Sequence, residues 1–248
     1  MSNDLQKLLK KFMEEYESEL NAARKDKDFK RPLGNIVRKD IACLIGVQLP
    51  ENIYKVKGSV GAGSWADVPW IGVFDKRVTT SAQRGVYIVY LLNKTTKELF
   101  LTLNQGVTDV VTASNSKAAD NLQNRAQSIR SKIGSFPGLE SSLNGSGSKA
   151  YDAGCIYYIK YTLDSLPEDE ILYSDLNKFI EAYKAYYDKV FLTSEENDVQ
   201  VEEGERELQV GQQIEKVFEY INSKGFVYDE KLLKNFYLSL KSKPFVLL

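Results

Sequence analysis

The sequence predicts an α+β fold: a curved mixed or antiparallel β-sheet flanked by helices, followed by a linker and a short helical segment. Two observations indicate this fold. Short alternating or continuous apolar runs, typical of strands, gather in the middle of the chain, and runs with helical spacing lie on both sides of them. Hydrophobic residues make up 43% of the 248 residues and charged residues 27%, so the chain has enough apolar surface for a packed core.

The first part of the chain is predicted to be helical. Apolar residues recur at helical spacing over residues 3–20. A charged connector over residues 21–34 leads to a second helix, from about Asn35 to Gln48, which Pro50 closes.

The middle of the chain is predicted to supply most of the sheet. Residues 53–60 alternate as a strand does, and residues 70–74 form a short apolar strand after a glycine-rich loop that holds both tryptophans. After a polar, basic loop, residues 85–93 and 98–104 are predicted to pair as a hairpin, because only the four residues KTTK join them.

The second half begins with a polar-faced helix over residues 116–133 and a turn-rich stretch over 134–149. A strand is predicted over residues 153–163. From about residue 166 the sequence becomes a long helix with a stripe of Tyr and Phe side chains.

The composition changes after this helix, where an acidic stretch almost without aromatic residues is typical of a linker. We therefore expect a first domain over residues 1–192, an acidic linker over 193–207 and a helical lead-in to a second domain over 208–248. The last residues, KPFVLL, have the composition of a buried strand, so we expect the sequence to be truncated within that second domain.

The residue types and motifs that the sequence lacks exclude several classes of catalytic and metal-binding sites. The chain has no histidine, which excludes Ser-His-Asp and Cys-His nucleophile systems and histidine metal sites. Its two cysteines, Cys43 and Cys155, do not form a CxxC motif and fit a reducing cytoplasm. The sequence contains neither a GxxxxGK[ST] phosphate loop nor an apolar run of 18 residues. We expect a cytoplasmic protein without a cofactor, a metal site or a membrane partner.

The charge is divided unevenly along the chain. Residues 21–135 carry 18 Lys or Arg against 9 Asp or Glu, whereas residues 136–248 carry 12 against 20. Such asymmetry suggests that the first half meets an anionic partner, although an accident of surface composition is the alternative.

Aromatic and basic residues are interleaved within this basic half. Aromatic faces stack on nucleic-acid bases, and Lys and Arg contact phosphates. The alternative is that alternating aromatic residues in strands belong to the core. We favour the core for Tyr90, and both interpretations stay open for Trp70 and Tyr87. The set comprises Trp65, Trp70, Tyr87, Tyr90 and Leu91 among Lys55, Lys57, Lys76, Arg77 and Arg84.

Three motifs follow one another in the same region. A G-x-G-[NS]-[WF]-x-x-[IV]-P-W segment spans Gly61 to Trp70, a G-[IV]-Y-x-V-x-L strand spans Gly85 to Leu91, and G-x-[ST]-[DE] spans Gly106 to Asp109. With these motifs the chain resembles the N-terminal DNA-binding domain of McrB-type modification-dependent restriction proteins. The resemblance covers roughly residues 50–192 and is weaker in its second half.

The resemblance implies binding of double-stranded DNA that contains a modified cytosine, such as 5-methylcytosine, with the modified base flipped into a pocket. The pocket walls would be Trp70, Tyr87 and Leu91. The best-known member carries a tyrosine between the two glycines of its loop, where this chain has Ala62, and Trp65 is the candidate replacement. The loop over residues 75–84 is also longer and more basic here. The DNA-contacting set comprises Gly61, Ala62, Gly63, Ser64, Trp65, Lys57, Lys76, Arg77, Thr79, Thr80, Ser81 and Arg84.

The resemblance also implies partners. In McrB-like proteins a GTP-hydrolysing motor of the AAA+ class follows the DNA-binding domain, assembles with its own copies and works with an McrC-like nuclease subunit. KPFVLL would be the strand before the phosphate loop of that motor. The chain itself is therefore expected to be a binding module without catalytic residues, and not an enzyme.

Three alternatives remain at this point. The first is a module of the same family that reads an unmodified sequence or a different base modification. A metal-dependent nuclease would need carboxylates such as Asp67, Asp75 and Asp109, although no short motif links them. A protein-interaction domain would use the aromatic side chains as a contact patch.

Overall fold

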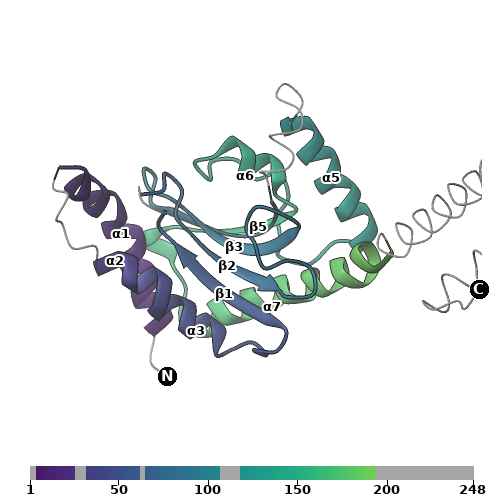
Figure 1. Cartoon of the computed structure of the whole chain (residues 1–248), viewed down its shortest axis with the longest axis horizontal. Helices are drawn as coiled ribbons and strands as arrows, with labels where there is room; N and C mark the ends of the chain where they lie inside the picture. Colours follow the sequence, from purple (N-terminus) through teal and green to yellow (C-terminus); the bar gives the residue numbers. More distant parts are fainter. Residues whose placement is uncertain (1–3, 26–31, 62–64, 107–117, 194–248) are drawn as a thin grey trace, which may run out of the picture. The chain divides into compact units, whose positions relative to one another are not determined.

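The computed structural model describes residues 4–25, 32–61, 65–106 and 118–193, and those up to Phe191 belong to one compact unit (Figure 1). Among them, five strands form one antiparallel sheet in the order β1-β2-β3-β4-β5, so the α+β prediction is confirmed and the antiparallel sheet is the type observed. The strands are β1 (Tyr54–Ser59), β2 (Trp70–Asp75), β3 (Val86–Asn93), β4 (Glu98–Gln105) and β5 (Tyr157–Tyr161).

The predicted hairpin is formed by β3 and β4. Its four-residue connection turns because the Asn93 side chain accepts hydrogen bonds from the backbone N–H groups of Thr95 and Thr96, and because Lys97 adopts a positive φ of 56°. Sequential strands pair throughout the sheet, as short connections favour.

The helices frame this sheet. A continuous helical run passes from Pro32 to Gly46, with a π-helical turn in its middle. The elements are α1 (Asp4–Lys25), α2 (Pro32–Asn35), η1 (Ile36–Ile41), α3 (Ala42–Gly46), α5 (Ala118–Ile133), α6 (Lys149–Gly154), the short η2 (Leu163–Ser165), α7 (Asp169–Tyr186) and its π-helical continuation η3 (Tyr187–Phe191).

Some predicted ends were wrong. Helix α1 continues through Lys25 into the expected connector, and the second helical run starts at Pro32, a residue suited to the first turn of a helix. Helix α6 occupies the beginning of the stretch predicted as a strand, and β5 begins only at Tyr157. Outside the described residues lie the acidic linker after its first residue, Thr193, the final segment and parts of two loops, 62–64 and 107–117.

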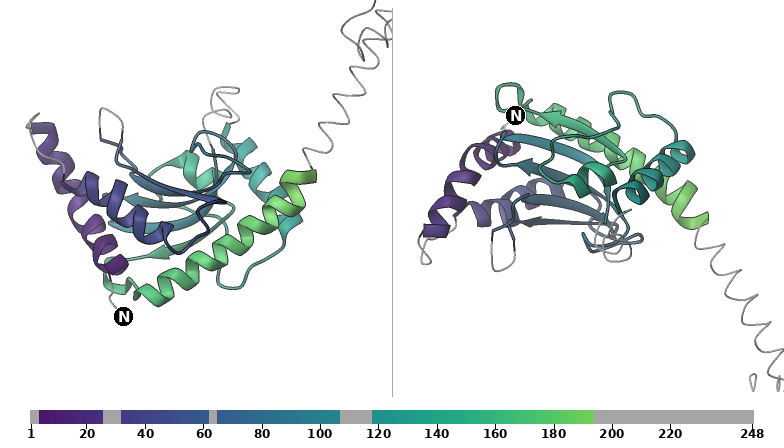
Figure 2. Two further views of the ribbon diagram at one scale, coloured as in Figure 1. Left: turned by 60° about the horizontal axis from the view of Figure 1, so that its bottom comes forward. Right: turned by 90° about the horizontal axis from the view of Figure 1, so that it is seen from above.

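The sheet is covered on both faces, and Figure 2 shows α6 and α7 on opposite sides of it. Ile88, Tyr90 and Leu92 of β3 enter the main core with α1 and α7. The alternate residues Tyr87 and Leu91, with Val89, enter a smaller cluster on the other face. Tyr90 is thus a core residue, as the sequence favoured.

Helix α1 is joined to α7 by a cap from a distant part of the chain. The backbone N–H groups of Leu5 and Gln6 donate to the two carboxylate oxygens of Asp169 at 3.1 and 2.7 Å. Asp169 is buried and stands in the first turn of α7, so one carboxylate lies at the N-terminal ends of both helices.

We expect Asp169→Ala to lower the free energy of unfolding by about 1 kcal/mol, the usual cost of losing an N-terminal cap. Urea unfolding followed by circular dichroism measures this loss. The matched control is Glu170→Ala, because Glu170 is exposed in the same first turn. Equal losses in the two variants would contradict the assigned role of Asp169.

Candidate nucleic-acid interface

The three expected wall residues lie on one face of the sheet. Trp70 is the register partner of Leu91 on the neighbouring strand, and Tyr87 stands four residues before Leu91 on the same strand. All three belong to the smaller cluster, in which Trp70 is partly buried and the other two are 0% exposed.

Phe74 lies between the two aromatic walls. Its ring centroid is 6.3 Å from that of Trp70, edge to face, and 5.2 Å from that of Tyr87. The sequence prediction missed Phe74, although the alternation in WIGVF places residues 70, 72 and 74 on one face. The three rings form an aromatic row, which we define as Trp70, Phe74 and Tyr87.

Tyr87 is fixed at its polar end. Its hydroxyl donates to the carbonyl oxygen of Ala82 at 2.9 Å, and burial raises the pKa of Tyr87 well above its usual value. The phenol is therefore neutral and remains a donor. This bond ties the wall residue to the basic loop that precedes β3.

A cover segment, residues 139–155, packs over this face. Leu143 and Cys155 are buried against it, and the Cys155 thiol has a pKa raised by burial. Asp152 accepts the backbone N–H groups of Gly145 and Ser146, and the Asn93 side chain donates to the carbonyl of Gly145 at 2.8 Å. The turn-rich stretch of the sequence is thus held onto the sheet by polar contacts.

Lysines extend the aromatic row toward the edge strand β1. Lys55 is the register partner of Phe74, and Lys57 is the partner of Gly72, so both lysines lie on the face of the aromatic row. Both are exposed. Nucleic-acid bases stack on aromatic faces beside cations; here the two cations are exposed, whereas Phe74 and Tyr87 are buried.

The glycine loop is anchored at both of its described ends. Gly61 has a φ of 105°, and its carbonyl accepts a hydrogen bond from the guanidinium of Arg38 on η1 at 3.0 Å. Trp65 is half-buried with its ring 5.0 Å from that of Tyr16, whose hydroxyl donates to Ala66. Ala62, Gly63 and Ser64 lie outside the described residues. Arg38 was missed because nothing local in the sequence connects it to the loop.

The basic loop uses part of its charge internally. Arg77 forms a two-bonded ion pair with Asp75, through Nε at 2.9 Å and a terminal nitrogen at 2.6 Å, and its guanidinium stacks 4.0 Å from the ring centre of Tyr187. Asp75 is 1% exposed, so removal of Arg77 would leave a buried carboxylate without a cation. Lys76 donates to the carbonyl of Glu51 at 2.6 Å.

The remaining predicted residues of the basic loop differ in exposure. Thr79 and Ser81 are half-buried and joined by hydrogen bonds of 3.1 Å between the threonine hydroxyl and the serine backbone. Thr80 and Arg84 are exposed.

The two loops stand at opposite ends of β2. The glycine loop leads into Trp70 at its start, and the basic loop leaves Asp75 at its end. The predicted DNA-contacting residues therefore form two groups, with Lys57 and the aromatic row lying along the strands between them.

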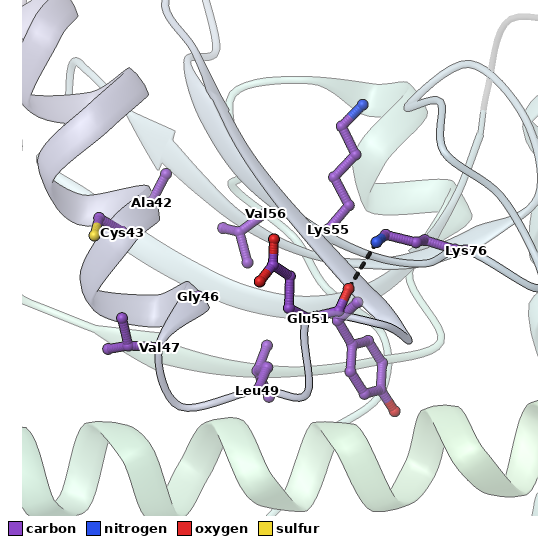
Figure 3. A pocket seen from close by; sticks show the side chains of 10 residues that line it. Ala42, Cys43, Gly46, Val47, Leu49, Glu51, Lys55, Val56 and Lys76 are labelled. Atoms are coloured by element: carbon purple, nitrogen blue, oxygen red, sulfur yellow. Dashed lines mark hydrogen bonds between the residues drawn. The ribbon is translucent and has the colours of Figure 1, made fainter.

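A groove of about 830 Å³ opens between α3 and the edge strand β1 (Figure 3). Lys55 and Lys76 lie on its strand side, and Cys43 and Val47 on its helix side. In the part of the chain that the structure describes, no three His, Cys, Asp or Glu residues gather as a metal site. Nor is any helix there long and apolar enough to cross a bilayer.

Comparison with known proteins gives a family match. The sequence model of a family described as "MrcB-like, N-terminal domain" matches residues 11–188, a stretch that contains all five strands of the sheet. No curated protein matches the chain.

We expect Arg77→Ala to lower the free energy of unfolding by about 2 kcal/mol, because it leaves the buried carboxylate of Asp75 without its cation. Chemical denaturation measures the loss. Lys76→Ala is the control, since the neighbouring side chain is exposed and bonds only to a backbone carbonyl. Unchanged stability in Arg77→Ala would show that the ion pair has no structural role.

Proposed function

We propose that this chain, which belongs to the family of MrcB-like N-terminal domains, is the DNA-binding specificity module of a modification-dependent restriction system. It recognises double-stranded DNA that contains a modified cytosine, such as 5-methylcytosine. The observation that carries the proposal is the aromatic row beside the exposed Lys55 and Lys57 on one face of the sheet.

Recognition of a modified base requires that the base leave the stack. Extrusion costs a few kcal/mol, and stacking on aromatic side chains returns about 1–3 kcal/mol per base. Trp70, Tyr87 and Leu91 are the proposed walls of the pocket that receives it. Their common face and the adjacency of Trp70 to Leu91 support this assignment.

General affinity comes from phosphate contacts. The exposed Lys57 is the strongest candidate, with Arg84, the glycine loop and the hydroxyls of Thr79, Thr80 and Ser81 as further contacts. Lys76 and Arg77 already have protein partners, so we assign them a smaller share than the sequence alone suggests.

The organisation of the whole protein follows from the same proposal. Residues 1–192 are the DNA-binding domain, 193–207 a linker, and 208–248 the lead-in to an AAA+ GTPase motor. That motor would assemble with its own copies and recruit an McrC-like nuclease subunit in the cytoplasm. In this proposal the nuclease subunit cleaves the DNA, and this chain recognises the target site.

The nuclease alternative is less well supported. Asp67 pairs with Lys94 and, at 3.8 Å, with Arg24, while Asp75 pairs with Arg77. These carboxylates are thus occupied by cations of the protein. Magnesium-dependent cleavage of DNA by the purified chain would establish the nuclease and refute the binding module.

We expect the protein to bind a duplex with 5-methylcytosine, 5-hydroxymethylcytosine or N4-methylcytosine more tightly than the same duplex with cytosine. Trp70→Ala should abolish this preference and retain weak, salt-sensitive binding, because phosphate contacts survive. Trp70→Phe keeps an aromatic face and should retain part of the preference. Fluorescence anisotropy with a panel of matched duplexes measures both effects. A folded Trp70→Ala variant with its full preference would exclude Trp70 from the pocket.

We expect the logarithm of affinity to fall linearly with the logarithm of salt concentration. Lys57→Ala should reduce the slope by about 0.9, the value for one phosphate contact. Lys160→Ala is the control, because Lys160 is exposed on the same face at the opposite edge of the sheet and pairs with Glu98 at 3.3 Å. Equal slopes for wild type and Lys57→Ala would remove β1 from the interface.

A further inference from the structure

We propose that Phe74 occupies the base pocket of the free protein and is displaced when a flipped base enters, so that residue 74 determines how tightly the pocket takes a base. The inference rests on the proposed function, in which Trp70, Tyr87 and Leu91 are the walls. It concerns a residue that neither the sequence motifs nor the family assignment singles out.

The first observation is that the space between the walls is filled. Tyr87 and Leu91 are 0% exposed and Phe74 is 1% exposed. The phenyl ring lies 5.2 Å from Tyr87 at an interplanar angle of 36°, and 6.3 Å from Trp70 at 80°. A pyrimidine is likewise a flat six-membered ring. Phe74 therefore already makes the aromatic contacts that a flipped base would make.

The second observation explains how the ring fits. Phe74 folds back over Gly72, where a Cβ atom would lie 2.5 Å from Cζ of Phe74 and 3.3 Å from the ring of Trp70. Real Cβ atoms do not approach so closely, so the filled arrangement depends on glycine at position 72. The position of the Phe74 ring therefore depends on the residue at position 72.

The third observation, on polar tethers, leads us to assign the movement to Phe74. Tyr87 is tied to Ala82 by its hydroxyl, whereas a phenyl ring has no polar tether. Phe74 itself is 1% exposed, but its register partner on the edge strand β1 is Lys55, which is exposed, so the next position toward the sheet edge is open to solvent. Rotation toward Lys55 empties the space between Trp70 and Tyr87.

When Phe74 fills the pocket in most molecules, the apparent affinity for a base equals the intrinsic affinity multiplied by the fraction of molecules whose pocket is open. A smaller side chain at residue 74, or a phenyl ring that is forced out of the pocket, removes this reduction in affinity. We expect Phe74→Leu and Phe74→Ala to bind a 5-methylcytosine duplex about tenfold more tightly than wild type. The unmodified duplex should gain less, because it binds chiefly through phosphates. Gly72→Ala keeps the phenyl ring but expels it, and should act in the same direction.

The experiment compares these variants with Phe100→Leu by fluorescence anisotropy on modified and unmodified duplexes. Phe100 is 1% exposed in the same cluster, but it stands on β4, outside the aromatic row. It therefore controls for a loosened cluster. If Phe74→Ala does not fold, Phe74→Leu and Gly72→Ala carry the same comparison. Affinities of these variants no higher than that of Phe100→Leu would overturn the inference.

A second measurement needs no DNA. Free 5-methylcytosine at millimolar concentration should raise the Tm of Phe74→Ala and leave the Tm of wild type unchanged. An equal rise in both proteins would show an open pocket, and no rise in either would show that no base site lies beneath Phe74; each result overturns the inference. The proposed function fails separately, if wild type shows no preference for any modified duplex.

Discussion

Strand β3 is buried on both of its faces, because helices cover one side of the sheet and the cover segment lies on the other. Ile88, Tyr90 and Leu92 pack into the main core, and Tyr87 and Leu91 pack into the smaller cluster. The residues proposed to receive a base are for this reason core residues as well. Loss of binding in a variant of Tyr87 must accordingly be separated from loss of the fold.

Contacts from α7, on the main-core face of the sheet, also position the strands of the candidate site. The hydroxyl of Tyr183 on α7 donates to the carbonyl of Val86 at 2.6 Å and accepts the backbone N–H of Asp75 at 3.2 Å. One side chain thus fixes the end of β2 and the start of β3, the two points between which the basic loop runs. Arg77, paired with Asp75 and stacked on Tyr187, adds a second link to the same helix.

Periodicity in the sequence predicted the strands and the common face of Tyr87 and Leu91, because alternation is a local property of the chain. It did not predict the cap that Asp169 provides to α1, since the partners lie 164 residues apart. The assignment of Arg77 to DNA ignored Asp75 two residues away, whose burial only the folded sheet reveals. The alternation of residues along β2 could have placed Phe74 on the face of Trp70. It could not predict that the phenyl ring packs over Gly72, because this depends on the side-chain conformation.

The chemistry of this face limits how a modified cytosine is distinguished. Burial of one methyl group contributes about 0.8 kcal/mol, which is roughly a fourfold preference. Beside Tyr87 and Val89, the polar side chains that β4 turns toward this face are Asn104 and Thr102, and each is already bonded, to the carbonyls of Tyr151 and Val89. A base in the place of Phe74 therefore meets apolar and aromatic walls on β2 and β3. In the proposed pocket these strands would select by ring shape and by the methyl group, and larger discrimination would require walls as firmly held as Tyr87 is by Ala82.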